Sequence, residues 1–137
     1  MRIFIDTGAW YALFNNLDIH HSRASAFVQK LIGQKARLFT SDYVIDETLT
    51  LIRARLGHEK AVEFGRWVLQ SPLVKVINVD EKIWQAAWDV FVRYDDKDFS
   101  FTDCTSFAIM RHLGLINALA FDHNFEQAGF VVLPYES

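Results

Sequence analysis

The chain has 137 residues, of which 51% are hydrophobic and 23% are charged. This length and composition predict a single globular domain over residues 1–137 and exclude a disordered or low-complexity chain. The formal net charge of −3 argues against a simple basic nucleic-acid binder, but a metal ion held by several acids would reverse the local charge and leave room for RNA.

The first half of the chain alternates short apolar runs with amphipathic segments. The run at 3–5 is typical of a strand that is buried on both faces. Gly33 is placed to end one helix, and Ser41 is placed to cap another that ends at Gly57. The predicted elements are a strand at 3–5, a helical turn at 9–14, a helix at 19–31, a strand at 36–40 and a helix at 42–56.

The second half continues the same alternation. Asp80 is placed to cap one helix, and Thr102 is placed to cap another that runs to Leu113 and is closed by Gly114. The predicted elements are a helix at 59–69, a strand at 73–79, a helix after Asp80, a polar loop at 94–100, a helix ending at 113, a strand at 118–121, a turn at 124–128 and a strand at 130–133.

Strands that are separated by helices predict right-handed crossovers and a mainly parallel sheet with helices on both faces. The expected fold class is therefore α/β, a three-layer α/β/α sandwich with a five-stranded sheet.

Four acids fall near one edge of this predicted sheet. Asp6 directly follows the first strand, and Asp122 directly follows the predicted strand at 118–121. Glu47 lies in the second turn of the helix after the second strand, and Asp103 lies in the first turn of its helix. Because ligands of parallel sheets bind outside the carboxyl ends of the strands, these four side chains are the candidate site.

Each acid also has an ordinary structural explanation. An Asp after a strand is often a turn residue, an acid at a helix start favours the helix dipole, and Glu47 flanks an apolar stripe as a solvated residue would. These explanations do not account for the convergence of all four. Clustered carboxylates repel unless a cation joins them, and hard oxygen ligands suit Mg²⁺, with Mn²⁺ as a substitute.

Four short blocks are similar to the sequence motifs of PIN-domain nucleases, in the order and spacing of that family. The blocks cover residues 3–7, 41–47, 99–104 and 120–125, and each contains one of the four acids. The resemblance covers essentially the whole chain, whose length is most similar to that of VapC-type toxins of toxin–antitoxin pairs.

This resemblance implies a Mg²⁺-dependent endoribonuclease in which Asp6, Glu47, Asp103 and Asp122 bind metal and carry catalysis. It also implies an RNA substrate, a small antitoxin partner and a homodimer. Two other functions stay open: a PIN-fold RNA-processing nuclease outside a toxin pair, and a PIN-like binding module without activity. An aspartate-based phosphatase is disfavoured because Gly8 stands where the second Asp of that motif belongs.

Other polar or reactive residues are interpreted as structural. Of the acids Asp95, Asp96 and Asp98, only Asp98 is kept as a candidate near the site. His20 and His21 lack metal-ligand spacing, and Thr7 and Thr102 have a possible role in orienting water or a ligand. Trp84 and Trp88 share a helix face, which favours core or interface packing over base stacking.

The expected location is the cytoplasm. The single cysteine, Cys104, has no partner for an internal disulfide, as is usual in a reducing compartment. No apolar run approaches the length of a membrane span, and Asp6 interrupts the apolar N-terminus too early for a signal peptide. We therefore expect no membrane association.

Overall fold

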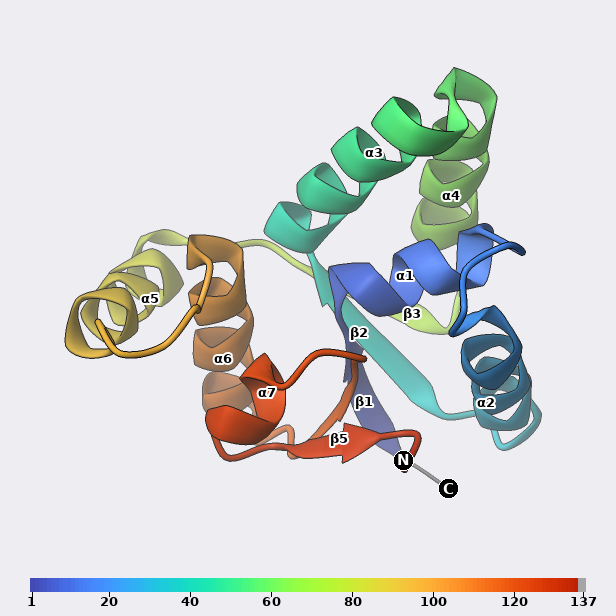
Figure 1. The fold of residues 1–137 in the computed structure, drawn as a ribbon. Helices are drawn as coiled ribbons and strands as arrows, with labels where there is room; N and C mark the ends of the chain where they lie inside the picture. Colours follow the sequence, from blue (N-terminus) through green and yellow to red (C-terminus); the bar gives the residue numbers. More distant parts are fainter. Residues whose placement is uncertain (136–137) are drawn as a thin grey trace.

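Five parallel strands form one sheet in the spatial order β3-β2-β1-β4-β5 (Figure 1). The computed structural model describes residues 1–135. Along the chain the strands are β1 (Arg2–Ile5), β2 (Arg37–Ser41), β3 (Val74–Ile77), β4 (Asn117–Leu119) and β5 (Val131–Leu133). Because β1 is the middle strand, it places Asp6 near the centre of the sheet's carboxyl edge.

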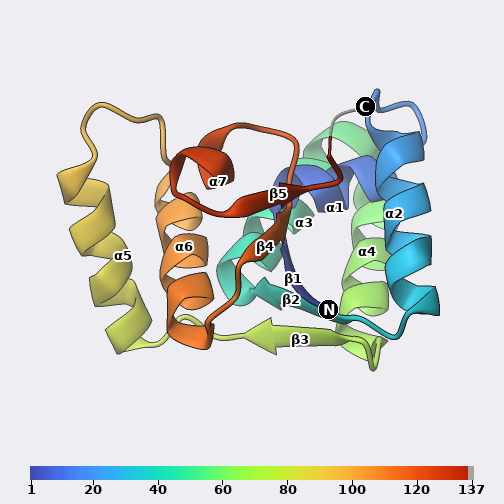
Figure 2. The same cartoon turned by 90° about the horizontal axis from the view of Figure 1, so that it is seen from below.

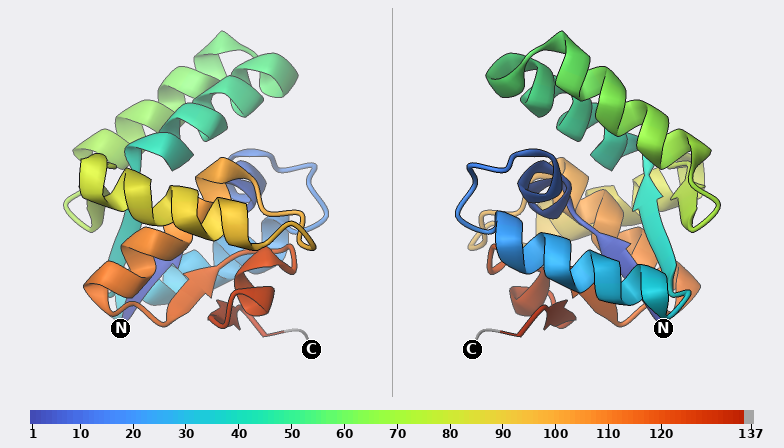
Figure 3. Two further views of the ribbon diagram at one scale, coloured as in Figure 1. Left: turned by 90° about the vertical axis from the view of Figure 1, so that its left-hand side faces the viewer. Right: turned by 90° about the vertical axis from the view of Figure 1, so that its right-hand side faces the viewer.

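Helices cover both faces of the sheet. The helices are α1 (Thr7–Phe14), α2 (His21–Gly33), α3 (Asp42–Leu56), α4 (His58–Gln70), α5 (Glu81–Arg93), α6 (Phe101–Leu113) and α7 (Asn124–Gln127). Figures 2 and 3 show α5 and α6 on one side of the sheet and α2 and α4 on the other. The predicted three-layer α/β/α sandwich with five strands is confirmed.

The position of β1 in the core explains why its sequence is an uninterrupted apolar run. Ile3, Phe4 and Ile5 are completely buried, because helices pack against both faces of the sheet at its middle strand. Within residues 1–135, no helix is both long enough and apolar enough to span a membrane.

Most predicted helix ends are confirmed by their capping contacts. The Ser41 hydroxyl accepts a hydrogen bond from the Val44 N–H, and the Asp80 carboxylate accepts one from the Ile83 N–H. Gly114, which follows α6, has a left-handed backbone with φ of 69°, a conformation that glycine adopts without strain.

Several predicted bounds differ by one or two residues, and three predictions about element ends are wrong in ways that change a cap or the site. Ser100, and not Thr102, caps α6, so the helix begins at Phe101. α2 continues two residues beyond its predicted end at 31 and includes Gly33, and the left-handed residue that follows it is Lys35. Strand β4 ends at Leu119, so Asp122 lies three residues beyond the strand and not directly after it.

Candidate active site

Asp6 is a buried carboxylate at the end of the central strand. Its backbone begins α1, but its side chain makes no capping hydrogen bond to that helix. Only 4% of its surface is exposed. Within residues 1–135, no Lys or Arg forms an ion pair with it. The ordinary explanation of Asp6 as a turn or cap residue therefore fails, and its charge is available for a ligand.

Asp103 combines a structural role with a free oxygen. Its Oδ2 accepts hydrogen bonds from the Ser100 N–H at 3.1 Å and from the Asn124 side-chain amide at 2.9 Å. The Ser100 hydroxyl in turn accepts a bond from the Asp103 N–H, which completes a capping box. These bonds lock the carboxylate in one orientation, and none of them uses its Oδ1.

Asn124 connects Asp103 to Asp122. The Asp122 Oδ1 accepts a hydrogen bond from the Asn124 N–H at 3.0 Å, while the Asn124 side chain donates to Asp103. One residue thus fixes two of the four acids relative to each other. Our sequence reasoning missed it, although the spacing Asp122-His123-Asn124 is a recognisable Asx-turn signal.

Glu47 lies at the periphery of this group. It projects from the second turn of α3 and is half-buried, as its position beside an apolar stripe predicts. No side-chain hydrogen bond within residues 1–135 restrains its carboxylate, in contrast to those of Asp103 and Asp122. Its negative charge nevertheless reaches the other acids, because it raises the pKa of both Asp6 and Asp103.

The four acids form one electrostatic cluster. Burial, followed by the charges of Asp103 and Asp122, raises the pKa of Asp6 well above the usual range, against a smaller lowering by the Thr7 N–H. Burial also raises the pKa of Asp103, against hydrogen bonds from Ser100 and Asn124 that lower it. The structure therefore brings all four predicted residues into electrostatic range of each other.

A divalent cation fits this donor set. Four converging carboxylates without a paired cation supply the hard oxygen ligands that Mg²⁺ and Mn²⁺ prefer. The Thr7 hydroxyl beside Asp6 is buried and has no hydrogen-bond partner, so it is an unused polar group at the same place. Among residues 1–135, no three potential ligands approach closely enough to hold an ion as they stand. Mg²⁺ does not require three protein ligands, because it usually keeps several waters and binds only one or two carboxylates directly.

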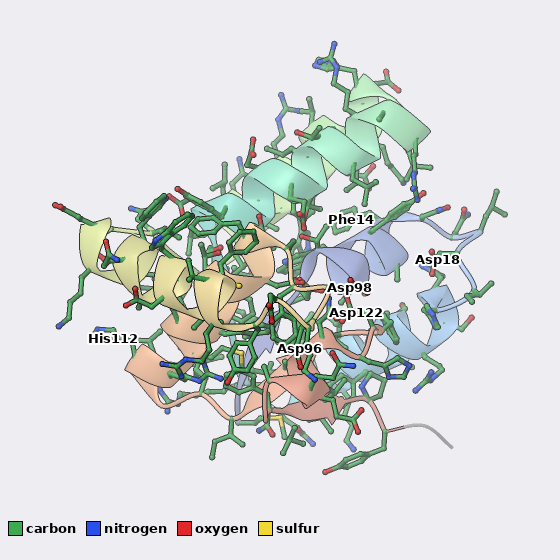
Figure 4. All side chains as sticks on the ribbon, turned by 60° about the vertical axis from the view of Figure 1, so that its left-hand side comes forward. Phe14, Asp18, Asp96, Asp98, His112 and Asp122 are labelled. Atoms are coloured by element: carbon green, nitrogen blue, oxygen red, sulfur yellow. The ribbon has the colours of Figure 1, made fainter. Side chains whose placement is uncertain are left out.

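The cluster opens to solvent through a cleft of about 280 Å³. Asp6 and Asp122 line it together with Tyr11, Arg55 and Phe121, among others. Figure 4 shows Asp122 near the centre of the side-chain view, with Asp18 of the same cleft on the loop between α1 and α2. The buried Asp6 carboxylate is therefore reachable by a ligand from outside.

Neither Asp98, which we kept as a candidate, nor the residues that we interpreted as structural take a direct part in the cluster. Asp95, Asp96 and Asp98 are exposed, and the charge of Asp98 is not among those that raise the pKa of Asp6. The Thr102 carbonyl accepts a bond from the Thr105 hydroxyl within α6. His21 is held by the Ala12 carbonyl, at 2.7 Å from its Nδ1.

Cys104 is also structural. It is completely buried, and desolvation followed by the Asp103 charge raises the pKa of its thiol to about 11. A thiol that stays protonated at neutral pH is a poor nucleophile, so Cys104 has a packing role.

Comparison with known proteins gives consistent matches over nearly the whole chain. The family model described as "PIN domain" matches residues 3–131. The "23S rRNA-specific endonuclease VapC20" of Mycobacterium tuberculosis is 42% identical over 130 residues, which are 94% of this chain and 95% of the relative. The "VapC ribonuclease" of Archaeoglobus fulgidus is 31% identical over 128 residues, which are 91% of this chain and 80% of the relative.

The fold agrees with these sequence matches. The crystal structure of M. tuberculosis VapC20, described as a "Sarcin-Ricin loop cleaving toxin", superposes with a TM-score of 0.85 at 42% identity. The superposition covers 94% of this chain and 96% of that one.

Proposed function

The chain belongs to the PIN domain family, and we propose that it is a divalent-metal-dependent endoribonuclease, the toxin of a type II toxin–antitoxin pair. We propose rRNA as the substrate class, because the M. tuberculosis relative, which is 42% identical over nearly its whole length, is named for cleavage of 23S rRNA. The inhibitor would be a small antitoxin protein.

One observation carries the proposal. Asp6, Glu47, Asp103 and Asp122 lie at one edge of the sheet and repel each other, and no Lys or Arg among the described residues forms an ion pair with any of them. Uncompensated carboxylates destabilise a fold, so their presence together is explained best by a bound cation. Mg²⁺ is the expected ion, and Mn²⁺ a substitute.

Each residue of the site has a proposed role in phosphodiester hydrolysis. A bound divalent ion would activate a water molecule and neutralise charge on the attacked phosphate. Asp6 and the free Oδ1 of Asp103 would hold the ion, and Asp122 and Glu47 would complete its shell or orient its waters. Asn124 would act as a positioning residue, because it holds Asp103 and Asp122 at fixed orientation. Such an arrangement needs no side-chain nucleophile.

The first test is cleavage of RNA by the purified protein. Ribosomal RNA and a mixed RNA pool are incubated with Mg²⁺, Mn²⁺ or EDTA, and the fragments are resolved on a sequencing gel. We expect cuts that need the metal and that Asp103→Asn abolishes. Asp46→Asn, an exposed acid next to Glu47, is the matched control and is expected to cut normally.

Equal cleavage by wild type and Asp103→Asn would contradict the proposed site. Cleavage that persists in EDTA would contradict the metal dependence. Adding the product of a small adjacent reading frame tests the toxin assignment, since a cognate antitoxin is expected to stop the cleavage. We propose the cytoplasm as the site of action, where the RNA substrate is found and where the single cysteine stays reduced.

We also propose that the chain forms a homodimer through an aromatic patch, made of Trp84, Trp88, Phe91 and Phe101. Trp84, Trp88 and Phe91 are 40%, 43% and 43% exposed, so the alternative that Trp84 and Trp88 lie in the core is wrong. Trp84 stacks on Trp88 with ring centroids 6.0 Å apart and contacts Phe101 at 5.2 Å. Ordered, exposed aromatic side chains are typical of protein interfaces.

The dimer proposal predicts a mass of about twice 15.9 kDa in sedimentation equilibrium. We expect Trp88→Arg to shift the protein to monomer at micromolar concentration, because a charge in the middle of the patch must be desolvated on association. Leu69→Arg, on the exposed face of α4, is the control and should leave the mass unchanged. A monomeric wild type, or a dimer that Trp88→Arg does not weaken, would contradict it.

A further inference from the structure

Two clefts meet at Asp122, and only one of them contains Asp6. The smaller cleft is the one that leads to the carboxylates. The larger, of about 550 Å³, continues on the other side of Asp122 and is lined by residues that include Arg23, His123 and Glu126. Three residues line both clefts: His20, Phe121 and Asp122. The larger cleft has the size of a site for a small organic ligand, for which roughly 300–1,000 Å³ is usual.

The side chains of His20 and Phe121 form a flat platform between the clefts. Their rings are parallel within 2°, with centroids 4.3 Å apart. Phe121 immediately precedes Asp122 in the chain, so the platform is fixed next to the carboxylate cluster. His20 is half-buried, which leaves part of its ring accessible from the clefts.

Helix capping does not explain His20. It occupies the N-cap of α2, a position that favours Ser, Thr, Asp or Asn, yet its side chain makes no capping bond. Its backbone N–H donates to the Asp18 carboxylate at 2.9 Å, so the local turn is held by Asp18 and not by the imidazole. Its ring stacks on Phe121 and makes no hydrogen bond within the described residues.

Positive charge lies on both sides of Asp122. Arg55 lines the smaller cleft, and Arg23 lines the larger one, where its guanidinium is 5.7 Å from the centre of the Phe121 ring. Acids are present as well, because Asp18, whose carboxylate accepts the His20 N–H, lines the smaller cleft and Glu126 lines the larger one. A chain of phosphates that crosses Asp122 would therefore meet an arginine before and after the carboxylates.

We propose that the two clefts form the path of a single RNA strand, in which the base of a nucleotide next to the cleaved bond stacks on His20, supported by Phe121. This inference rests on the proposed function and adds to it a residue that binds the substrate. Base stacking on a flat side chain suits single-stranded RNA, whose bases are free of a helix. His20 would therefore govern binding, and the carboxylates would govern the chemical step.

The test separates binding from cleavage. An RNA oligonucleotide that spans the cut is compared with versions that carry one abasic nucleotide at successive positions, and KM and kcat are measured for wild type, His20→Ala and His20→Phe. We expect His20→Ala to raise KM about 5- to 150-fold, with kcat within about threefold. His20→Phe keeps a stacking ring and should restore KM.

One abasic position should abolish the effect of His20→Ala, because no base remains there to stack. At all other positions the penalty of His20→Ala should persist. His112→Ala, an exposed histidine of α6 that Figure 4 shows well apart from Asp122, is the control for loss of a histidine elsewhere. A thermal melt of each variant excludes misfolding.

Failure of the inference differs from failure of the proposed function. Binding of the same fluorescently labelled oligonucleotide in EDTA is measured by anisotropy and needs no cleavage. If RNA binding depends on His20 but the RNA is not cut, the proposed strand path is supported and the proposed nuclease activity is refuted. A penalty for His20→Ala that is absent, or equal at every abasic position, would overturn the inference while leaving the nuclease intact.

Discussion

Asp6→Asn should reduce RNA cleavage by a factor on the order of 10³ or more while the protein stays folded. The amide is similar in size to the carboxylate but carries no charge to hold a divalent ion, and metal-ion catalysis contributes several kcal/mol to such reactions. Asp6 is the most buried of the four acids. The measurement is kcat on the RNA that the cleavage test identifies as the substrate, with Asp46→Asn as control.

The same substitution should stabilise the metal-free protein. The pKa of Asp6 is raised in the folded state, so the folded protein binds this proton more tightly than the unfolded chain does. The protonated Asp6 therefore stabilises the folded state at a pH below the usual pKa of a carboxyl group, and this stability is lost as the pH rises through the folded-state pKa. At neutral pH in EDTA, Asp6→Asn removes that penalty and should raise Tm by about 4 °C for each kcal/mol recovered.

Two outcomes would contradict this account of Asp6. A folded Asp6→Asn protein that still cleaves RNA at the wild-type rate would remove it from the catalytic site. A Tm that falls in EDTA would indicate that the carboxylate stabilises the fold and has a structural role. The two measurements are independent, because one depends on the ion and the other is made without it.

Mg²⁺ or Mn²⁺ should raise the Tm of the wild-type protein, and removal of the ion should abolish its cleavage of RNA. An ion that binds only the folded state adds about 2.7 kcal/mol of stability at a hundredfold excess over its Kd. The shift should vanish in Asp6→Asn. Asn124→Ala should keep a shift but require about 10- to 100-fold more metal, because Asn124 only orients Asp103 and Asp122.

The metal titration also has a clear contrary result. Equal Tm shifts in wild type and Asp6→Asn would show that the ion binds elsewhere on the protein. Absence of any shift, together with cleavage in EDTA, would exclude the metal mechanism. Differential scanning fluorimetry at fixed ionic strength is the appropriate measurement, since exposed charges respond to salt alone.

Local patterns were sufficient to predict the sheet and most of its helices. Ser41 and Asp80 cap their helices through bonds to residues three positions later, so a short sequence window contains the whole signal. The strand β1 could be predicted from its apolar run because it is buried on both faces. The four acids could be predicted as a group because parallel strands present their carboxyl ends at one edge.

The errors arose where two local patterns compete or where contacts are distant. Thr102 and Ser100 are both good N-cap residues, and the choice depends on Asp103 reaching back to the Ser100 N–H. The bond from Asn124 to Asp103 spans 21 positions, so no window around either residue reveals it. Whether Trp84 and Trp88 are buried depends on which helices pack on α5, and this too is set by tertiary structure.

The order of the acids along the chain has a consequence for synthesis. The central strand β1 is made first, but its neighbour β4 is made after six of the seven helices. A growing chain therefore carries Asp6 and Glu47 long before Asp103 and Asp122 emerge. The carboxylate cluster can therefore assemble only after Asp122 has been synthesised, and a shorter nascent chain is expected to be inactive.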